Sequence, residues 1–236
     1  MEGRKAGGRL RLWALAPLWL LGILAVLMAS LRLIINDRDY FLNIYTKLDM
    51  ERRIGISPED CADAMMAMVG YMEGARDSIQ LEVTELGQQV AMFNQQEIDH
   101  MVDVRNLYQG FCHIQTAGML VLAALLLAGI WGLWKKRPWA AGLAGSWWLG
   151  LGLFGCILLG LGAYAAVDFN AFWTSFHHVF FTNDLWLMDY ATCRMIRICP
   201  LGLFSGIILR FTCLGLGLLA LLSLFMAVLA RRGRRV

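Results

Sequence analysis

The sequence predicts an all-α integral membrane protein, with four transmembrane helices and two outward-facing, partly helical loops that cap the bundle. Of its 236 residues, 58% are apolar and only 17% are charged, and the mean hydropathy is +0.56. Four apolar stretches each reach the roughly 20 residues that a helix needs to cross a bilayer. This composition excludes an intrinsically disordered chain, a nucleic-acid-binding module and an ordinary soluble domain.

The four predicted spans follow one another with two long connections. They cover residues 12–31, 116–134, 139–166 and 203–230. Together they take up roughly half of a short chain, which leaves no room for a separate large domain. We therefore expect a single membrane domain over residues 1–236, with its first span retained rather than cleaved as a signal peptide.

Basic residues gather in three short segments beside the predicted spans. They are Arg4, Lys5, Arg9 and Arg11 before the first span, Lys135, Lys136 and Arg137 (followed by Pro138) between the second and third, and Arg231, Arg232, Arg234 and Arg235 after the fourth. Positive charge in short loops stays on the cytoplasmic side, and four spans put all three segments on one side. Both termini are therefore expected in the cytoplasm, and the formal net charge of +3 reflects insertion rather than nucleic-acid binding.

Two segments face outward in this topology, residues 35–115 and 168–200, and they hold all four histidines. In the first segment, Ser57-Pro58-Glu59 predicts a helix start, with a serine cap, a proline at the first helical position and an acid in the first turn. An apolar stripe follows at helical spacing and predicts a packing face, with a lipid-chain groove as the alternative. It consists of Ala62, Met65, Met66, Val69 and Met72.

Asn94 and Glu97 have the spacing of a capping box, so a helix is expected to begin near Gln95. No glycine, proline or turn cluster interrupts it before Gly110, which predicts one long helix running into the second span. Glu97 and His100 share a face with apolar residues, where a carboxyl and an imidazole need partners. The apolar residues of that face are Met101, Val104, Leu107, Tyr108 and Phe111, and His113 falls far from it.

The second outer segment predicts an amphipathic helix in the membrane interface, because its aromatic residues share one face. These residues are Phe169, Phe172, Trp173, Phe176 and Phe180. His177 lies at the edge of that face and His178 on the opposite side. The chain is then expected to turn at residues 182–186, and Pro200 precedes the last span.

Two stretches of the outer segments resemble the signatures of a bacterial membrane-protein family. Glu97-Ile98-Asp99-His100-Met101-Val102-Asp103-Val104-Arg105 is similar to its E-x-x-H-x-x-D-V pattern, and Phe176-His177-His178-Val179-Phe180-Phe181 with Asn183-Asp184-Leu185-Trp186 is similar to its second signature. The family is that of the lipoprotein intramolecular transacylase, and the resemblance covers nearly the whole chain. It implies a multi-pass protein of the bacterial cell membrane whose active site faces outside.

The resemblance also implies a reaction. The substrate is a lipoprotein whose N-terminal cysteine carries a diacylglyceryl thioether, and the sn-2 acyl chain moves to the α-amine of the same cysteine. The product is a lyso-form lipoprotein, and no cofactor, metal ion or second lipid donor takes part. The implied partners are the lipoprotein and membrane lipid, without nucleic acid, and the oligomeric state stays open.

Aminolysis of an ester needs a proton acceptor, a proton donor and a stabilised oxyanion. We expect His100 and His177 to form the catalytic acid–base pair, without assigning either to acid or base. Glu97 or Asp103, each one helical turn from His100, is expected to fix its tautomer. Because the substrate amine is itself the nucleophile, no acyl-enzyme is required.

Further residues of the two signatures are expected to support the histidines. Asn183, or backbone N–H groups in the turn that contains it, would hold the oxyanion. Trp186 belongs to the second signature. Asp103, Arg105 and Asp184 form either substrate contacts or a structural ion network.

Each of these polar residues also has a structural interpretation. His100 can be a core histidine bonded to Glu97, and His177 an interfacial side chain that could exchange roles with His178. Arg210, about two turns into the last span, either snorkels to the outer interface or contacts a lipid ester or backbone carbonyl.

Other functions stay open at this level. A metal-dependent hydrolase would use Glu97, His100 and His177 as ligands, although their spacing differs from the two-histidine zinc helix. A non-enzymatic accessory or transport protein is disfavoured, because the predicted spans are almost free of acids. Catalysis by Ser175 or a cysteine lacks a nucleophile motif. The open disulfide pairings are Cys193 with Cys199 and Cys61 with Cys112.

Overall fold

The computed structural model of the chain describes residues 13–137 and 139–233. These residues fall into two compact units. The first comprises residues up to 29, 112–173 and from 213 onward; the second comprises residues 30–111 and 174–212. Several residues of the predicted basic segments lie outside the described residues. They are Arg4, Lys5, Arg9, Arg11, Arg234 and Arg235, together with Pro138.

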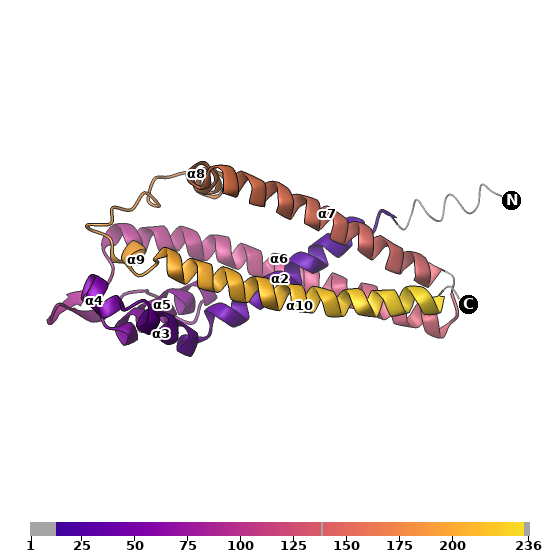
Figure 1. The fold of residues 1–236 in the computed structure, drawn as a ribbon, viewed down its shortest axis with the longest axis horizontal. Helices are drawn as coiled ribbons and strands as arrows, with labels where there is room; N and C mark the ends of the chain where they lie inside the picture. The colour runs from indigo at the N-terminus through magenta and orange to yellow at the C-terminus, as the bar shows by residue number, and fades with distance from the viewer. Residues whose placement is uncertain (1–12, 138, 234–236) are drawn as a thin grey trace. The chain divides into compact units, whose positions relative to one another are not determined.

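Helices dominate the described chain, as Figure 1 shows. The long helices are α2 (Ala16–Ile35), α6 (Gln95–Trp134), α7 (Trp139–Val167) and α10 (Leu201–Gly233). The shorter ones are α3 (Arg38–Lys47), α4 (Met50–Ile54), α5 (Pro58–Glu73), α8 (Phe169–Phe180) and α9 (Arg194–Arg197). One hairpin, β1 (Glu82–Glu85) and β2 (Gln88–Ala91), interrupts the helical order.

The predicted fold class is confirmed. Within residues 13–137 and 139–233, four helices are long and apolar enough to cross a membrane, namely α2, α6, α7 and α10. The expected bounds of the first span were 12–31, whereas α2 continues to Ile35. The extra turn has a physical reason, because Arg32 on α2 donates to both carboxylate oxygens of Glu73 at 3.0 and 2.5 Å.

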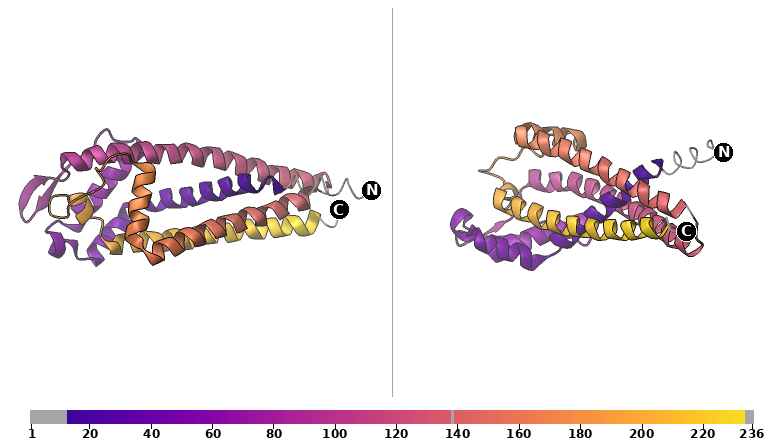
Figure 2. Two further views of the ribbon diagram at one scale, coloured as in Figure 1. Left: turned by 90° about the horizontal axis from the view of Figure 1, so that it is seen from above. Right: turned by 45° about the vertical axis from the view of Figure 1, so that its right-hand side comes forward.

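The first unit is built from parts of the four long helices packed along one another (Figure 2). Trp19 of α2 lies against Trp147 of α7 with ring centroids 5.5 Å apart, and its indole N–H donates to Ser146. Small residues allow this approach: a Cβ on Gly150 would stand 2.7 Å from the Cβ of Trp19. Small residues and polar hydrogen bonds at helix contacts are how helices associate in lipid.

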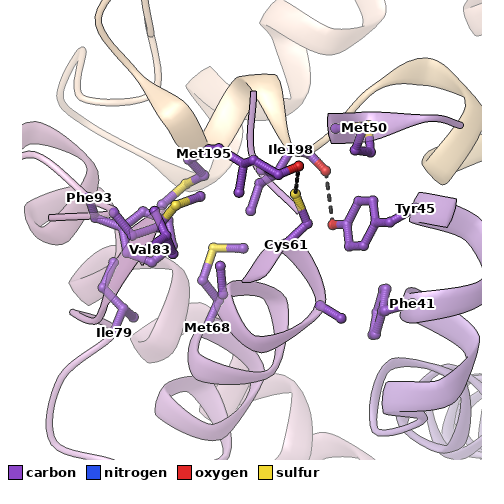
Figure 3. Close-up of a cluster of buried hydrophobic side chains, with 14 of the residues drawn as sticks. Phe41, Tyr45, Met50, Cys61, Met68, Ile79, Val83, Phe93, Met195 and Ile198 are labelled. Carbon is purple, nitrogen blue, oxygen red and sulfur yellow. Dashed lines mark hydrogen bonds between the residues drawn. The ribbon is translucent and has the colours of Figure 1, made fainter. Parts of the chain in front are cut away.

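The core of the second unit brings α3, α5, the hairpin region and α9 around methionine and aromatic side chains (Figure 3). Tyr45 is fully buried, and its hydroxyl donates to the backbone oxygen of Ile198 at 2.9 Å. Cys61 and Met68 of α5 are buried in the same cluster. The core therefore joins residues of the first outer segment to residues that directly precede the last span.

The helix start predicted at Ser57-Pro58-Glu59 is confirmed. Ser57 is the N-cap of α5 and its hydroxyl accepts from the backbone N–H of Asp60 at 3.0 Å. The predicted stripe is a packing face, in which Ala62 and Val69 are buried and the three methionines Met65, Met66 and Met72 pack against the core while partly exposed.

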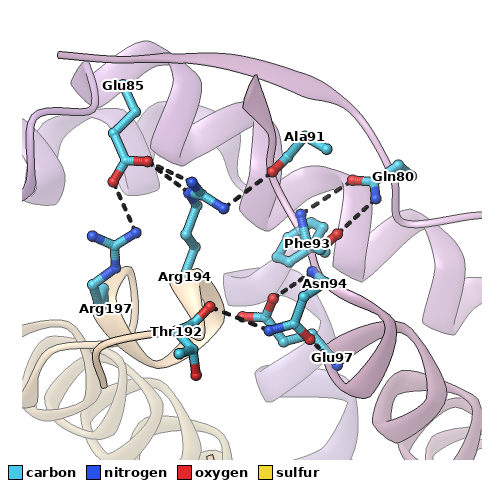
Figure 4. A network of polar contacts seen from close by, with 9 residues as sticks. All are labelled: Gln80, Glu85, Ala91, Phe93, Asn94, Glu97, Thr192, Arg194 and Arg197. Atoms are coloured by element: carbon cyan, nitrogen blue, oxygen red, sulfur yellow. Dashed lines mark hydrogen bonds and ion pairs between the residues drawn. The ribbon is translucent and has the colours of Figure 1, made fainter. Parts of the chain in front are cut away.

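The hairpin was not predicted from the sequence. Leu86 and Gly87 turn the chain with φ values of 51° and 83°, which is the left-handed backbone of a two-residue hairpin turn. Glu85, at the end of β1, accepts from Arg194 at 2.6 Å and from Arg197 at 2.8 Å. These two ion pairs attach the hairpin to α9 (Figure 4).

Candidate active site

The N-terminus of α6 is held by the predicted capping box. The side-chain oxygen of Asn94 accepts from the backbone N–H of Glu97 at 3.0 Å, and Glu97 Oε2 accepts from the backbone N–H of Asn94 at 2.7 Å. The other carboxylate oxygen of Glu97 accepts from the backbone N–H of Met195 in α9 at 2.5 Å. The fully buried Glu97 thus joins the start of α6 to the second outer segment. Figure 4 shows Glu97 beside Asn94, whose side-chain amide donates to the backbone oxygen of Thr192 in the same segment.

Glu97 and His100 share the buried face, as predicted, but the carboxylate serves a different partner. Both Glu97 oxygens accept from backbone N–H groups rather than from the imidazole. The Nδ1 atom of His100 is buried and has no hydrogen-bond partner among the described residues. The first residue of the signature therefore builds the turn that carries His100.

The two proposed catalytic histidines come together although they lie on different helices. His100 on α6 and His177 on α8 are 8% and 6% exposed. Both rings contact Phe181, with centroid distances of 5.4 Å for His100 and 5.7 Å for His177. The two imidazoles are also close enough to interact electrostatically.

The structure distinguishes His177 from its neighbour. His177 is buried, whereas His178 is exposed. The ring of Trp186 stacks on His177 with centroids 4.5 Å apart and an interplanar angle of 25°, and it meets His178 edge-on at 5.5 Å. The indole nitrogen of Trp186 is buried without a hydrogen-bond partner in the part of the chain that is described.

Asp103 and Asn183 connect the same two helical segments. The amide nitrogen of Asn183 donates to Asp103 Oδ2 at 2.8 Å, and its oxygen accepts from the backbone N–H of Leu185 at 3.1 Å. The predicted turn after α8 is thereby formed, and it is tied to α6 one helical turn beyond His100.

Within residues 13–137 and 139–233, two predicted supporting residues, Arg105 and Asp184, make no contact with either histidine. Arg105 lies over the ring of Tyr71 on α5, 4.7 Å from its centroid. Asp184 is exposed in the turn after α8, and its backbone oxygen accepts from Leu187. Arg210 lies elsewhere in the second unit, where it pairs with Asp37 at 3.1 Å.

Burial governs the ionisation of the site. Glu97 and His100 lie outside the membrane-crossing part of α6. The helix from His100 to Trp134 is about 51 Å long, whereas the hydrocarbon core of a bilayer is only about 30 Å thick. Burial lowers the pKa of His100 below its usual 6.5, the nearby His177 lowers it further, and Asp103 opposes both. Burial raises the pKa of Glu97, while the N–H groups of Asn94 and Met195 oppose that rise.

The described residues contain no group of three histidine, cysteine or acidic side chains arranged to hold a metal ion. All six cysteines are free, so the open disulfide pairings are not formed. Cys193 precedes and Cys199 follows the short helix α9, which separates the two along the chain. Burial raises the pKa of Cys61 and of Cys199 to about 12, so neither is a ready nucleophile near neutral pH.

Sequence reasoning missed two residues that shape the site. Phe181 contacts both imidazoles. In the sequence it is one of several consecutive apolar residues, so nothing there distinguishes it from its neighbours. Gln96 donates to the backbone oxygens of Leu185 and Leu187 at 3.1 Å each. The polar character of Gln96 at the start of α6 was the only signal in the sequence. It could not identify the partners of Gln96, because Leu185 and Leu187 are distant in the sequence.

The comparisons with known proteins identify the family of the chain. The family model of the lipoprotein intramolecular transacylase Lit matches residues 17–204. The chain belongs to the Lit family. Membership identifies it as an enzyme rather than an accessory protein, and it confirms the resemblance drawn from the two signatures.

Solved structures of Lit from Bacillus cereus, a membrane-integral lipoprotein intramolecular transacylase, share the fold. One has a TM-score of 0.72 at 15% identity, over 94% of this chain and 97% of that one. Two others carry a histidine replaced by arginine or by alanine, with TM-scores of 0.73 and 0.70 at 15% identity. Each covers 99% of this chain and 98% of the other. No curated protein matches.

Proposed function

We propose that this Lit-family enzyme moves the sn-2 acyl chain of a diacylglyceryl-cysteine lipoprotein to the α-amine of the same cysteine, with His100 and His177 as the acid–base pair. The observation that carries the proposal is the meeting of these two buried histidines, one from each signature, against Phe181. Paired imidazoles suit a reaction whose only requirements are proton transfer and charge stabilisation.

The proton balance of the reaction is closed without any cofactor. The neutral amine attacks the ester carbonyl, the C–N bond forms, and the C–O bond to the glycerol oxygen breaks. One proton leaves the amine and one proton reaches the departing oxygen. Because its pKa is lowered, His100 is neutral at pH 7 and is assigned the role of base, and His177 delivers a proton to the glycerol oxygen. Transfer of the amine proton from His100 to His177 then restores the pair for the next turnover.

The oxyanion of the tetrahedral intermediate needs a donor beside the histidines. The indole N–H of Trp186 is buried without a partner among the described residues, and its ring stacks on His177. Asn183 already uses its amide group for Asp103 and its oxygen for Leu185. We therefore assign the oxyanion to Trp186, and to Asn183 the task of holding Asp103 and the turn in place.

Access from the lipid phase follows from the exposed face of α8. Val179 is 75% exposed and Phe180 is 40% exposed, one and two residues beyond His178. Phe180 packs against Phe111 with centroids 5.9 Å apart. These exposed apolar side chains support the proposal that an acyl chain of the substrate lies along α8, with its ester beside the histidines.

The proposed placement is the outer side of a bacterial cell membrane, with both termini in the cytoplasm. It is supported by the basic residues Lys135, Lys136 and Arg137, which follow α6 at the end opposite to His100. Short basic loops stay in the cytoplasm, so His100 belongs outside.

The reaction is tested in a bacterial host that makes only diacylglyceryl lipoproteins. The chain or its variants are expressed, their insertion is checked, and N-terminal lipopeptides are analysed by mass spectrometry. We expect N-acylated, lyso-form peptides with the unmodified chain and with His178→Ala, and diacylglyceryl peptides with His100→Ala and with His177→Ala. Unchanged diacylglyceryl peptides with the inserted, unmodified chain would remove the transacylase proposal.

A further inference from the structure

We propose that a pocket between α3 and α10, away from the histidines, binds the headgroup of a zwitterionic phospholipid with a primary amine. The pocket has a volume of about 550 Å³, within the usual range of about 300–1,000 Å³ for small-molecule sites. Its polar lining includes Asp37, Asp39, Tyr40 and Arg210. The proposed reaction does not use this pocket.

The pocket lies at the level of a bilayer surface. Arg210 and Arg231 both lie on α10, and the 21 residues between their positions correspond to about 31 Å of helix. The hydrocarbon core is about 30 Å thick, and Arg231 belongs to the basic segment at its other boundary. Arg210 is therefore placed where lipid phosphates lie, and the exposed Leu209 beside it faces the acyl chains.

Arg210 is held in position to receive a phosphate. Its guanidinium donates to Asp37 at 3.1 Å and lies over the ring of Tyr40, 4.3 Å from the centroid. Asp37 is itself fixed, because its other oxygen accepts from the backbone N–H of Tyr40 as the N-cap of α3. The Arg210 side chain is still 47% exposed, so N–H groups remain for a ligand, and guanidinium binds phosphate oxygens well.

Tyr40 adds a donor that the protein leaves unused. Its hydroxyl is buried and has no hydrogen-bond partner in the described residues. It lies over Gly206 of α10, where a Cβ would stand 2.7 Å from the hydroxyl and 2.6 Å from Ile44. The glycine lets α3 approach α10 and forms the floor of the pocket. Unpaired buried donors are uncommon, and a small rotation of the Tyr40 side chain is needed to bring the hydroxyl to a phosphate oxygen.

The charges of the pocket select the class of headgroup. Asp37 and Asp39 balance Lys47 and Arg210 in the lining, whereas sites for anionic lipids carry an excess of basic residues. Asp39 is exposed, and its carboxylate accepts no hydrogen bond from the described residues. It is available to a primary ammonium beside a phosphate held at Arg210. A quaternary ammonium has no N–H to donate to it.

The test is native mass spectrometry of the full-length protein in detergent, titrated separately with phosphatidylethanolamine, phosphatidylcholine and phosphatidylglycerol of the same acyl chains. We expect phosphatidylethanolamine to bind at least tenfold more tightly than the other two. Arg210→Gln should weaken all three lipids, and Asp39→Asn should remove the preference while leaving binding in place. Asp63→Asn, an acid of α5 that pairs with Arg38 outside the pocket, is the matched control and should behave like the unmodified protein.

Each other outcome contradicts the proposal. Equal affinities for the three lipids, or a preference that survives Asp39→Asn, would show that the pocket does not recognise the primary amine of the headgroup. Tightest binding of phosphatidylglycerol would make it an anionic-lipid site. Soluble phosphoethanolamine that binds as tightly as the lipid would identify a water-soluble occupant instead. The thermal midpoint of each variant distinguishes lost binding from lost folding, and Asp39→Asn changes an exposed residue, so it tests the proposal even if Arg210→Gln unfolds.

Discussion

His177 and His178 are adjacent in the sequence but differ in environment, and this difference carries the residue-level account. His177 is buried between Phe181 and the stacked ring of Trp186, whereas His178 is exposed. The second signature contains two adjacent imidazoles, the resemblance to the family favours His177 over His178, and the structure separates the two by their burial. His100, reached from another helix, shares Phe181 with His177.

The ionisation of His100 predicts a pH dependence. Because its pKa is lowered by burial and by His177, the neutral base persists below pH 6.5, and the rate should fall only at still lower pH. Asp103 opposes that lowering, so Asp103→Asn should move the acid limb of the rate profile to lower pH. The measurement is the initial rate of N-acylation of a synthetic diacylglyceryl lipopeptide across pH. An acid limb that moves to higher pH in the variant would contradict the account.

The role assigned to Trp186 predicts the effect of removing its indole N–H. Trp186→Phe keeps an aromatic ring to stack on His177 but lacks the indole N–H. We expect kcat to fall about 10²-fold, as for loss of one oxyanion donor, with KM little changed. Trp173→Phe, on the exposed part of α8, is the matched control. Equal losses in the two variants would mean that Trp186 contributes packing alone.

At the level of elements, the capping box shows what the sequence determines and what it does not. The spacing of Asn94 and Glu97 predicted both the start of α6 and the reciprocal bonds that form there. The bond from Met195 to the other oxygen of Glu97 joins residues from two outer segments. No local pattern predicts such a contact, because it depends on how the segments pack.

Glu97→Gln should therefore lower the stability of the protein, and its direct effect on kcat should be small. A glutamine side chain has one acceptor oxygen, so one of the two backbone N–H groups is left buried and unsatisfied. That costs about 1–3 kcal/mol of unfolding free energy, which should appear as a lower thermal midpoint in detergent. Glu82→Gln, at an exposed position of β1, is the control. An unchanged midpoint with a large loss of kcat would instead place Glu97 in the reaction.

The short elements escaped prediction for a common reason. α4, α9 and the two strands each span only four or five residues, too few for a periodic pattern to emerge. They are stabilised by contacts with distant residues, such as those of Glu85 with Arg194 and Arg197. The long helices, by contrast, carry their own signal in twenty or more residues, which is why their number and order were predicted.

At the level of the whole molecule, the distribution of charge predicts the topology. A fluorescent protein fused after Val236 should be fluorescent in the cytoplasm, and alkaline phosphatase inserted at the hairpin turn, Gly87, should be active outside. Replacing Lys135, Lys136 and Arg137 by glutamine should weaken this orientation, because it removes the basic loop between α6 and α7. Phosphatase activity from a fusion after Val236 in the unmodified chain would reverse the topology and place the histidines inside.

The most direct test of the central claim is a crossover experiment with the purified full-length enzyme. Two synthetic diacylglyceryl lipopeptides of different mass are mixed, one of them with a deuterated sn-2 chain, and the N-acylated products are analysed by mass spectrometry. The account predicts that the deuterated chain stays on its own peptide. His100→Ala and His177→Ala should each reduce the rate about 10²–10⁴-fold, while the exposed His113→Ala keeps it. Deuterated chains on the other peptide, or full activity without either buried histidine, would contradict an intramolecular transfer by this pair.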